Sequence, residues 1–349
     1  MDNKILIIDD EPNNLNILRK CLCNANFKVF VAKDGEAALK RLNHIKPDLI
    51  LLDVMMPGID GFETCRQLKK NELTKEIPVI FVTAKAEAID KVKGLEIGAV
   101  DYITKPFQVE EVIARVNKHL TINNLHKQLE TQNTQLQEHV YRLESLATLG
   151  KAINEAPGMV KMMDNAMQVT LSTFKCDRAW LVYPCDPTSV NCQIRIETTT
   201  PEYPGVKTLN EDIPISPEVA KVMKKVLSTT EAIPFGVKHK YQLPATSRKQ
   251  FSVQAAMVIA IYPKIGKPWL FGLHQCSYAR KWTENELNLF QDFGRHISES
   301  LGAFFSFEEL KKSENQFRSY FESASMGFAI TSLEKSWLYA NNCVCNILG

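Results

Sequence analysis

The sequence predicts an α/β fold over residues 1–121, built on a five-stranded, parallel, doubly wound sheet, then a helical coiled-coil linker over 122–150 and α+β regions beyond it. Three observations support this prediction. Short apolar runs alternate with amphipathic stretches in the first part, apolar residues recur every seven positions in the second, and strand and helix patterns are mixed in the third. The apolar runs are continuous, which is typical of strands buried on both faces of a parallel sheet.

The first region alternates five predicted strands with five predicted helices. The strands are expected at 4–8, 28–32, 48–52, 78–82 and 100–103, and the helices at 12–24, 34–43, 60–71, 86–95 and 107–119. The carboxyl ends of parallel strands meet at one edge of a sheet, where such folds bind ligands. Polar residues follow four of the strands: Asp9, Asp10 and Glu11 the first, Asp53 the third, Thr83 the fourth and Lys105 the fifth. We therefore expect these residues to form one site.

The residue types at this edge suit metal-assisted phosphoryl transfer. Neighbouring carboxylates repel one another, so keeping Asp9, Asp10 and Asp53 ionised requires a counter-cation, and hard oxygen ligands in this number favour Mg²⁺. An aspartate can accept a phosphoryl group as an acyl phosphate, and a lysine such as Lys105 can pair with the transferred group. The hydroxyl of Thr83 is a donor that could follow the phosphoryl group.

Sequence motifs at these strand ends resemble those of a known family. They are Asp9-Asp10-Glu11-Pro12, Asp53 through Gly58 with Asp60-Gly61, Thr83-Ala84, and Asp101 through Phe107 with Lys105-Pro106 inside it. In this order and at this spacing they are similar to the full motif set of the receiver domains of two-component signalling. The resemblance covers residues 1–120 and implies a flavodoxin-like fold that receives a phosphoryl group from a histidine kinase or phosphotransfer protein.

The resemblance also implies a role for each acidic residue. Asp53 would be the phosphoacceptor. Asp10 would be a direct acidic ligand of Mg²⁺, with Asp9 beside it acting through water, and the backbone carbonyl of Met55 would complete the protein ligands. Each residue alone has an ordinary explanation, such as a helix cap, so the assignment depends on their joint occurrence.

Three further residues would respond to the phosphoryl group in such a domain. Lys105 would pair with the phosphate, and the Lys105–Pro106 peptide bond is expected to be cis. Thr83 and Tyr102 would form the switch pair, in which the hydroxyl moves toward the phosphate and the aromatic ring moves inward. Taken singly, Thr83 is a strand end and Tyr102 a core residue.

The linker carries a heptad pattern. Ile122, Leu129, Leu136 and Leu143 recur every seven residues, and the other seam position holds His126, Asn133, Val140 and Ala147. Leucine at one seam position with polar residues at two of the others describes a modest parallel two-stranded coiled coil, in which Asn133 would set the register and favour a homodimer. The alternative is a solvated single helix between domains.

Residues 151–307 show mixed helix and strand patterns, with strands expected at 178–183, 192–199, 255–262 and 269–276 and a closing helix from about Thr283 that Glu286 would cap. The stretches 176–187, 200–205, 267–277 and 282–286 resemble a GAF domain. The resemblance implies a six-stranded antiparallel sheet, a concave ligand pocket and dimerising flanking helices.

Some GAF domains hold a bilin through a cysteine thioether. Cys185 and Cys276 are the candidates here, with His274 near the second, but the order His274-Gln-Cys276 reverses the usual Cys-His signature. An unidentified small ligand and a purely structural, dimer-transmitting domain are the alternatives. Trp180 and Trp269 are expected in the core.

Residues 308–349 continue the helix as a connector and then open another domain. Glu314 through Glu322, Met326 through Ile330, and Asn341 with Cys345 resemble the start of a PAS domain. About 40 residues are near the lower limit for burying a core. We therefore expect an incomplete domain and loose packing.

The function expected from these parts is phosphorelay signal transduction, passed through the linker to GAF and PAS modules and to an effector beyond residue 349, either a histidine kinase or a diguanylate cyclase. Against an enzyme within the chain, none of the seven histidines precedes an acidic residue, and no glycine-rich nucleotide-binding box or Gly-Gly-Asp-Glu-Phe motif occurs. Against a DNA-binding regulator, the heptad helix lies where a winged helix would begin.

Composition supports the same class. The 349 residues include 42 basic and 40 acidic side chains, a net charge of +2 that gives no electrostatic reason to expect nucleic acid or an anionic membrane as partner. The longest apolar run is too short to insert into a membrane and no signal peptide is visible, so a cytoplasmic location is expected. The nine cysteines lack zinc-ligand spacing and are expected to be reduced thiols.

Overall fold

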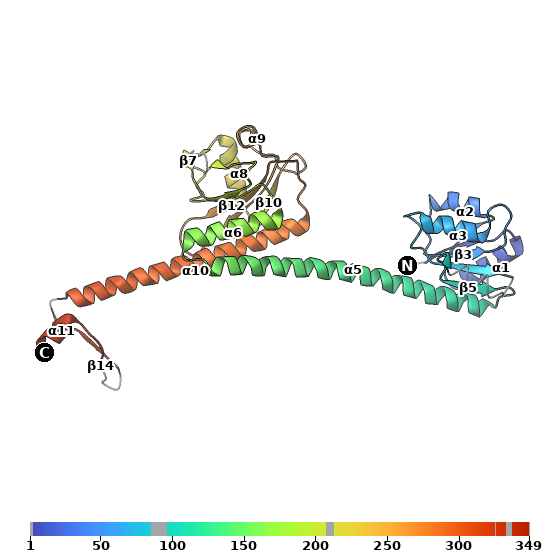
Figure 1. Cartoon of the computed structure of the whole chain (residues 1–349), viewed down its shortest axis with the longest axis horizontal. Coiled ribbons are helices and arrows are strands. Elements are labelled where there is room, and N and C mark those ends of the chain that lie inside the picture. Colours follow the sequence, from blue (N-terminus) through green and yellow to red (C-terminus); the bar gives the residue numbers. More distant parts are fainter. Residues whose placement is uncertain (1–2, 85–95, 207–212, 325, 333–336, 349) are drawn as a thin grey trace. The chain divides into compact units, whose positions relative to one another are not determined.

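The structure is a computed structural model that describes residues 3–84, 96–206, 213–324, 326–332 and 337–348 (Figure 1). The helix expected at 86–95 lies outside the described residues. The chain divides into two compact units, residues 1–137 and 138–349.

Unit 1 contains a five-stranded parallel sheet flanked by helices, as the sequence predicted (Figure 1). The strands are β1 (Lys4–Ile8), β2 (Lys28–Ala32), β3 (Leu49–Asp53), β4 (Val79–Thr83) and β5 (Asp101–Thr104), and their spatial order is β2-β1-β3-β4-β5. The helices are α1 (Pro12–Asn24), α2 (Gly35–Leu42), α3 (Gly61–Lys70) and the first part of α5 (Val109–Asn154). Asp53 and Thr83 are the last residues of their strands.

Both faces of this sheet are buried, which explains the continuous apolar runs. Leu6 and Ile50 pack with Phe62 on one face, while Ile7 and Leu51 belong to the core on the other. Side chains alternate between faces along a strand, so strands covered on both sides need apolar residues at every position.

The turn after β3 brings α3 close beneath the end of that strand. A Cβ atom at Gly61 would lie 2.1 Å from the carbonyl oxygen of Asp53, so only glycine fits where this helix begins. The helix is capped by Asp60, whose side chain accepts a hydrogen bond of 2.7 Å from the backbone N–H of Glu63. This turn fixes the backbone that carries Asp53.

Helix α5 is continuous over 46 residues, where the sequence suggested a helix at 107–119 and a separate linker at 122–150. No proline or glycine interrupts it before Gly150, so nothing in the sequence ends the first helix. Its early residues Val112 and Val116 are buried in the core of unit 1. The heptad residues farther along are exposed, with 51% of the surface of Ile122 accessible and 60% of that of Leu136. The coiled coil stays a prediction.

Unit 2 contains an antiparallel sheet of five strands in the order β10-β11-β12-β6-β8. They are β6 (Arg178–Val182), β8 (Ile194–Thr199), β10 (Ile233–Gly236), β11 (Ala255–Ile261) and β12 (Trp269–Gln275). The expectation of six strands was wrong for the described residues, because β7 (Asn191–Cys192) and β9 (Ile213–Pro214) form a separate two-residue ladder. Prolines at 201, 204 and 214 lack the N–H groups that a longer strand there would need.

Helices cover both faces of this sheet. The helices α6 (Met159–Phe174) and α10 (Glu284–Ser323) pack on one face, where Phe271, Phe290 and Phe293 are fully buried (Figure 1). The helices α8 (Pro217–Leu227) and α9 (Ala245–Phe251) lie on the other. The capping box predicted for α10 is confirmed, since Thr283 and Glu286 exchange hydrogen bonds at the start of the helix.

The C-terminal segment packs loosely, as expected. It contains β13 (Ala329–Thr331), β14 (Trp337–Ala340) and α11 (Asn342–Leu348). The apolar side chains of Met326, Phe328 and Tyr339 are exposed. The buried Asn341 side chain holds the segment together by donating hydrogen bonds to the carbonyls of Phe321 and Met326, both at 2.9 Å.

Two expectations drawn from composition can be compared with the structure. All nine cysteines are free thiols, and six of them are buried, as expected for small apolar side chains. Among the described residues, no helix is both long enough and apolar enough to span a membrane.

Candidate functional site

Three carboxylates meet at the carboxyl edge of the sheet in unit 1. Asp9, Asp10 and Asp53 each offer one oxygen atom, and these oxygens lie within 4.8 Å of one another. Asp9 follows β1 and Asp53 ends β3, and these two strands are neighbours in the sheet. Asp9 and Asp53 are buried, whereas Asp10 is exposed, so the cluster opens to solvent on the side of Asp10.

A single lysine pairs with the two buried carboxylates. The Nζ atom of Lys105 lies 2.7 Å from Oδ2 of Asp53 and 2.9 Å from Oδ2 of Asp9. Lys105 follows β5, and the Lys105–Pro106 peptide bond is cis, as predicted. The lysine therefore supplies one positive charge against three clustered negative charges.

The electrostatics of the cluster follow from burial and this charge imbalance. Burial raises the pKa of Asp53, and the neighbouring charge of Asp9 raises it further, while the hydrogen bond and charge of Lys105 oppose the change. Burial alone would lower the pKa of Lys105, but its hydrogen bonds to Asp53 and Asp9 outweigh that and raise it. The lysine stays charged, whereas an ionised Asp53 is costly without a further cation.

Asn14 also supports the site, and sequence reasoning missed it. Its Nδ2 atom donates to Oδ1 of Asp9 at 3.1 Å and to Oε2 of Glu11 at 3.1 Å. The backbone N–H of Glu11 donates to the same carboxylate at 2.9 Å. These bonds orient Asp9 toward the cluster. The available signal was the position of Asn14 in the first turn of α1, directly after the acidic run.

The predicted switch residues lie on adjacent strands. Thr83 is buried at the end of β4, and Tyr102 is half-buried in β5, which pairs with β4. The guanidinium of Arg115 lies 5.8 Å from the centre of the Tyr102 ring. Met55 exposes its side chain, and its backbone N–H donates to Oδ1 of Asp53 at 3.4 Å. Their roles in switching and metal binding stay predictions.

A second network that sequence reasoning missed joins β5 to α5. Asp101 accepts hydrogen bonds from Arg115 and from the Nε2 atom of His119, both at 2.8 Å. Burial would raise the pKa of Asp101, but the bonds from His119 and Arg115 outweigh it and lower the pKa. Asp101, which precedes Tyr102, is thus hydrogen-bonded to two residues of α5.

The donor set at the strand ends can hold a divalent cation. Carboxylate oxygens are the hard ligands that Mg²⁺ and Ca²⁺ prefer, and the exposed Asp10 leaves room for waters or a phosphate. The same cluster brings a carboxylate and an ammonium group together at a solvent-accessible edge. Such a site can bind a phosphoryl group and stabilise its charge.

Unit 2 holds a cavity that is lined by two of the residues considered above, Trp180 and His274. Trp180 and Trp269 are both buried in core clusters, as expected, and Trp180 also lines this cavity. His274 also lines it, but neither Cys185 nor Cys276 does. Burial raises the pKa of the Cys185 thiol to about 12 and that of Cys276 to about 11. Neither thiol is therefore in the nucleophilic thiolate form at neutral pH.

Comparison with known proteins finds a family match within the first unit. Residues 5–117 match the sequence profile of the response regulator receiver domain family. The alkaline phosphatase synthesis transcriptional regulatory protein PhoP of Bacillus subtilis is 50% identical over 116 residues, which are 33% of this chain and 48% of that protein. The match thus spans about half the length of this curated relative.

Solved structures of receiver domains resemble about a third of the chain. The signal receiver domain of a signal transduction histidine kinase from Syntrophus aciditrophicus is 35% identical, covering 34% of this chain and 90% of that one, with a TM-score of 0.33. The receiver domain of the Francisella response regulator 1452 is 33% identical, covering 34% and 98%, with a TM-score of 0.33. The profile match and the identity to the curated relative place phosphorelay signalling in residues 5–117, which form a response regulator receiver domain.

Proposed function

We propose that Asp53 accepts a phosphoryl group from a histidine kinase or a phosphotransfer protein, and that Asp9, Asp10, Asp53 and the carbonyl of Met55 hold the Mg²⁺ ion that this reaction needs. The observation that carries the proposal is the position of the Asp53 carboxylate, 2.7 Å from Lys105 and within 4.8 Å of the oxygens of Asp9 and Asp10. No further enzymatic activity is proposed within these residues.

The chemistry of the proposed transfer uses two groups of this chain directly. An oxygen of Asp53 attacks the phosphorus of the donor, the bond from phosphorus to the donor histidine nitrogen breaks, and an acyl phosphate forms. When bound, Mg²⁺ neutralises charge on the transferring group. The ammonium of Lys105 is already in place beside Asp53 to pair with a phosphate oxygen. Asp9, held by Asn14, keeps the second acidic group oriented.

The phosphorylated state would be passed to α5. In this proposal Thr83 moves toward the phosphate and Tyr102 moves inward on the neighbouring strand. Arg115 of α5 contacts both Asp101 and the Tyr102 ring, so a change at Tyr102 reaches the helix through this side chain. Such a relay requires an element with two conformations whose equilibrium is shifted both by phosphorylation and by the region that receives the signal.

The remaining proposals concern the rest of the chain. We take 1–121 as the receiver, 122–150 as a coiled-coil signalling helix, 151–307 as a GAF domain that senses a small ligand, and 308–349 as a connector helix with a PAS domain start. The exposed heptad residues of α5, Leu136 and Leu143 among them, support a homodimer. The output would come from an effector beyond residue 349, a histidine kinase or a diguanylate cyclase.

The phosphoacceptor can be tested with a small phosphodonor. The full chain would be incubated with radiolabelled acetyl phosphate and Mg²⁺, alongside Asp53→Asn and the control Asp48→Asn. Asp48 directly precedes the other end of β3, and its side chain accepts a hydrogen bond from the backbone N–H of Lys4. We expect label in the parent and the control but none in Asp53→Asn. Equal labelling of all three would overturn the proposal.

A further inference from the structure

Unit 2 contains a cavity of about 110 Å³ between the sheet and the helices α8 and α9. Its floor is the sheet face that carries Trp180, Ala256 and Leu270, and its roof includes Met223 of α8 and Ser247 of α9. An apolar cavity of ~150 Å³ in another protein binds benzene, so this space suits a molecule with one aromatic ring.

Two small residues create the space. A Cβ atom at Gly272 would lie 2.1 Å from Cζ2 of Trp180, so the indole lies flat across the strand at this glycine. Ala256, directly opposite His274 on the neighbouring strand, leaves the area beside the ring open. The flat indole face offers a stacking surface for a second ring.

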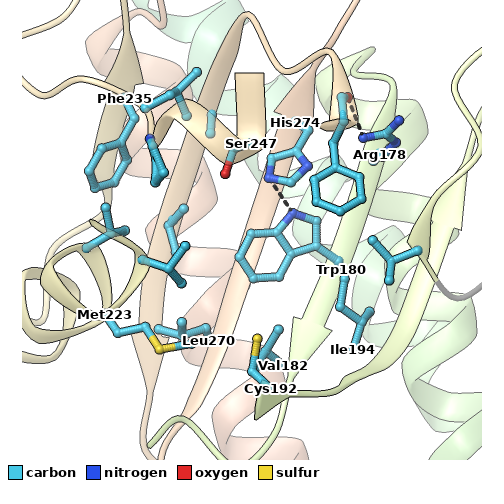
Figure 2. Close-up of a pocket in the computed structure, with 18 of the residues that line it drawn as sticks. Arg178, Trp180, Val182, Cys192, Ile194, Met223, Phe235, Ser247, Leu270 and His274 are labelled. Atoms are coloured by element: carbon cyan, nitrogen blue, oxygen red, sulfur yellow. Dashed lines mark hydrogen bonds between the residues drawn. The ribbon is translucent and has the colours of Figure 1, made fainter. Parts of the chain in front are cut away.

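Three polar residues that line the cavity lie at one end of it (Figure 2). Ser247, His274 and Arg178 lie at this end, whereas Met223, Leu270 and Cys192 lie at the other, with Trp180 between them. Arg178 is 5% exposed and donates hydrogen bonds to the carbonyls of Tyr203 and Phe251 at 3.0 and 2.9 Å. The cavity is therefore amphipathic along its length.

His274 has an unsatisfied donor at this end. The Nε1–H group of Trp180 donates to its Nε2 atom at 3.1 Å, so the ring proton of the neutral imidazole must be on Nδ1. The Nδ1 atom is buried and has no hydrogen-bond partner among the described residues. Burial lowers the pKa of His274 to about 3, with the charge of Arg178 lowering it further, so the ring stays neutral. A buried donor without a partner calls for an explanation such as a bound molecule.

Ser247 adds a second unused group. Its hydroxyl points into the cavity next to His274 (Figure 2), and it has no side-chain hydrogen bond among the described residues. The charges around the cavity are mixed, because Glu197 lines it together with Arg178. A ligand charge would therefore gain no net attraction while losing its hydration, which favours an uncharged ligand.

We infer that this cavity binds an uncharged molecule with a single aromatic ring and one hydroxyl or carbonyl group, stacked on Trp180 with its polar group toward Ser247 and His274. The inference rests on the sensory role proposed for residues 151–307 and names its ligand class. It is independent of phosphoryl transfer, which Asp53 labelling measures separately.

The test uses three probes of similar size on the full chain: phenol, toluene and benzoate, with binding followed by saturation-transfer nuclear magnetic resonance. Phenol is expected to saturate one site, toluene to bind more weakly, and benzoate not to bind. Ser247→Ala should weaken the binding of phenol about fivefold, the effect of losing one hydrogen bond, and should leave the binding of toluene unchanged. The control Ser172→Ala, on a helix that covers the opposite face, should change neither.

A cavity-filling variant completes the test. Ala256→Leu should abolish binding of phenol and toluene while tryptophan fluorescence reports a folded unit. Should that variant not fold, the effect of Ser247→Ala on phenol alone decides the matter. Failure of phenol to saturate, phenol affinity that Ser247→Ala leaves intact, or benzoate binding tighter than phenol would each overturn the inference.

Discussion

The Nζ atom of Lys105 lies 2.7 Å from Oδ2 of Asp53 and also reaches Oδ2 of Asp9 at 2.9 Å, so one cation is shared by two buried carboxylates. A third carboxylate, that of Asp10, lies within reach of the same point. This arrangement leaves the cluster short of positive charge.

Removing the charge of Asp53 should stabilise the receiver domain at neutral pH. The raised pKa of Asp53 means that the folded domain holds its proton better than the unfolded chain. Stability therefore falls as the pH rises from the unfolded pKa through the folded pKa. Asp53→Asn removes this ionisation and should raise the Tm at neutral pH, as measured by calorimetry. An unchanged or lower Tm, with Asp48→Asn as control, would contradict this.

Removing Lys105 should have the opposite effect. Lys105→Met leaves Asp9 and Asp53 buried without their shared partner, and breaking a buried ion pair in this way costs about 3 kcal/mol. Mg²⁺ should restore much of this stability, because binding to the folded state alone is stabilising. Urea unfolding with and without Mg²⁺ measures both effects. If the Lys105→Met variant were as stable as the parent in metal-free buffer, the ion pairs of Lys105 with Asp9 and Asp53 would not stabilise the site.

The heptad residues of α5 should hold two chains together. They are exposed in the single chain, with Leu143 66% accessible, which is costly for a leucine unless a partner covers it. Sedimentation should show a dimer that Leu136→Ser with Leu143→Ser dissociates at least tenfold more readily. The matched control is Thr131→Ser with Glu138→Ser, on the far side of the helix. A monomeric parent would rule out the coiled coil.

Acid should destabilise unit 2 through His274. The pKa of His274 is about 3 in the folded unit and near 6.5 in the unfolded chain, so on acidification the unfolded chain binds the proton at a higher pH. The contribution of His274 to the free energy of unfolding is therefore complete above pH 6.5 and is lost as the pH falls below that value. Between pH 7 and pH 5 the loss should be ~2 kcal/mol. Tryptophan fluorescence during urea unfolding reports this unit, since all four tryptophans lie beyond residue 179. His274→Gln should show a shallower pH dependence; an unchanged slope would contradict the assignment.

The receiver domain was predictable because its signals are local. Continuous apolar runs mark strands that are buried on both faces, and the rule that ligands bind at the carboxyl strand ends brings Asp9 and Asp53 together without further information. Contacts that depend on helix orientation were not predictable. Asn14 on Asp9, and Arg115 and His119 on Asp101, are side-chain contacts that no sequence pattern announces.

Unit 2 was predicted only in part, for physical reasons. The strands at 255–261 and 269–275 and the capping box at Thr283 have strong local patterns, and the structure confirms them. The elements between residues 217 and 251 follow prolines and short apolar runs, so their patterns are weak. The cavity depends on Gly272 and on how Trp180 packs against it, which is set only when distant strands pair.

The position of the acyl phosphate tests the central claim most directly. Borohydride reduces an acyl phosphate to an alcohol and so converts a phosphorylated aspartate to homoserine, which peptide mass spectrometry locates. After incubation of the full chain with acetyl phosphate and Mg²⁺, homoserine is expected at position 53 and at no other carboxylate. Homoserine at position 10, or a phosphorylated chain with aspartate intact at position 53, would contradict the account.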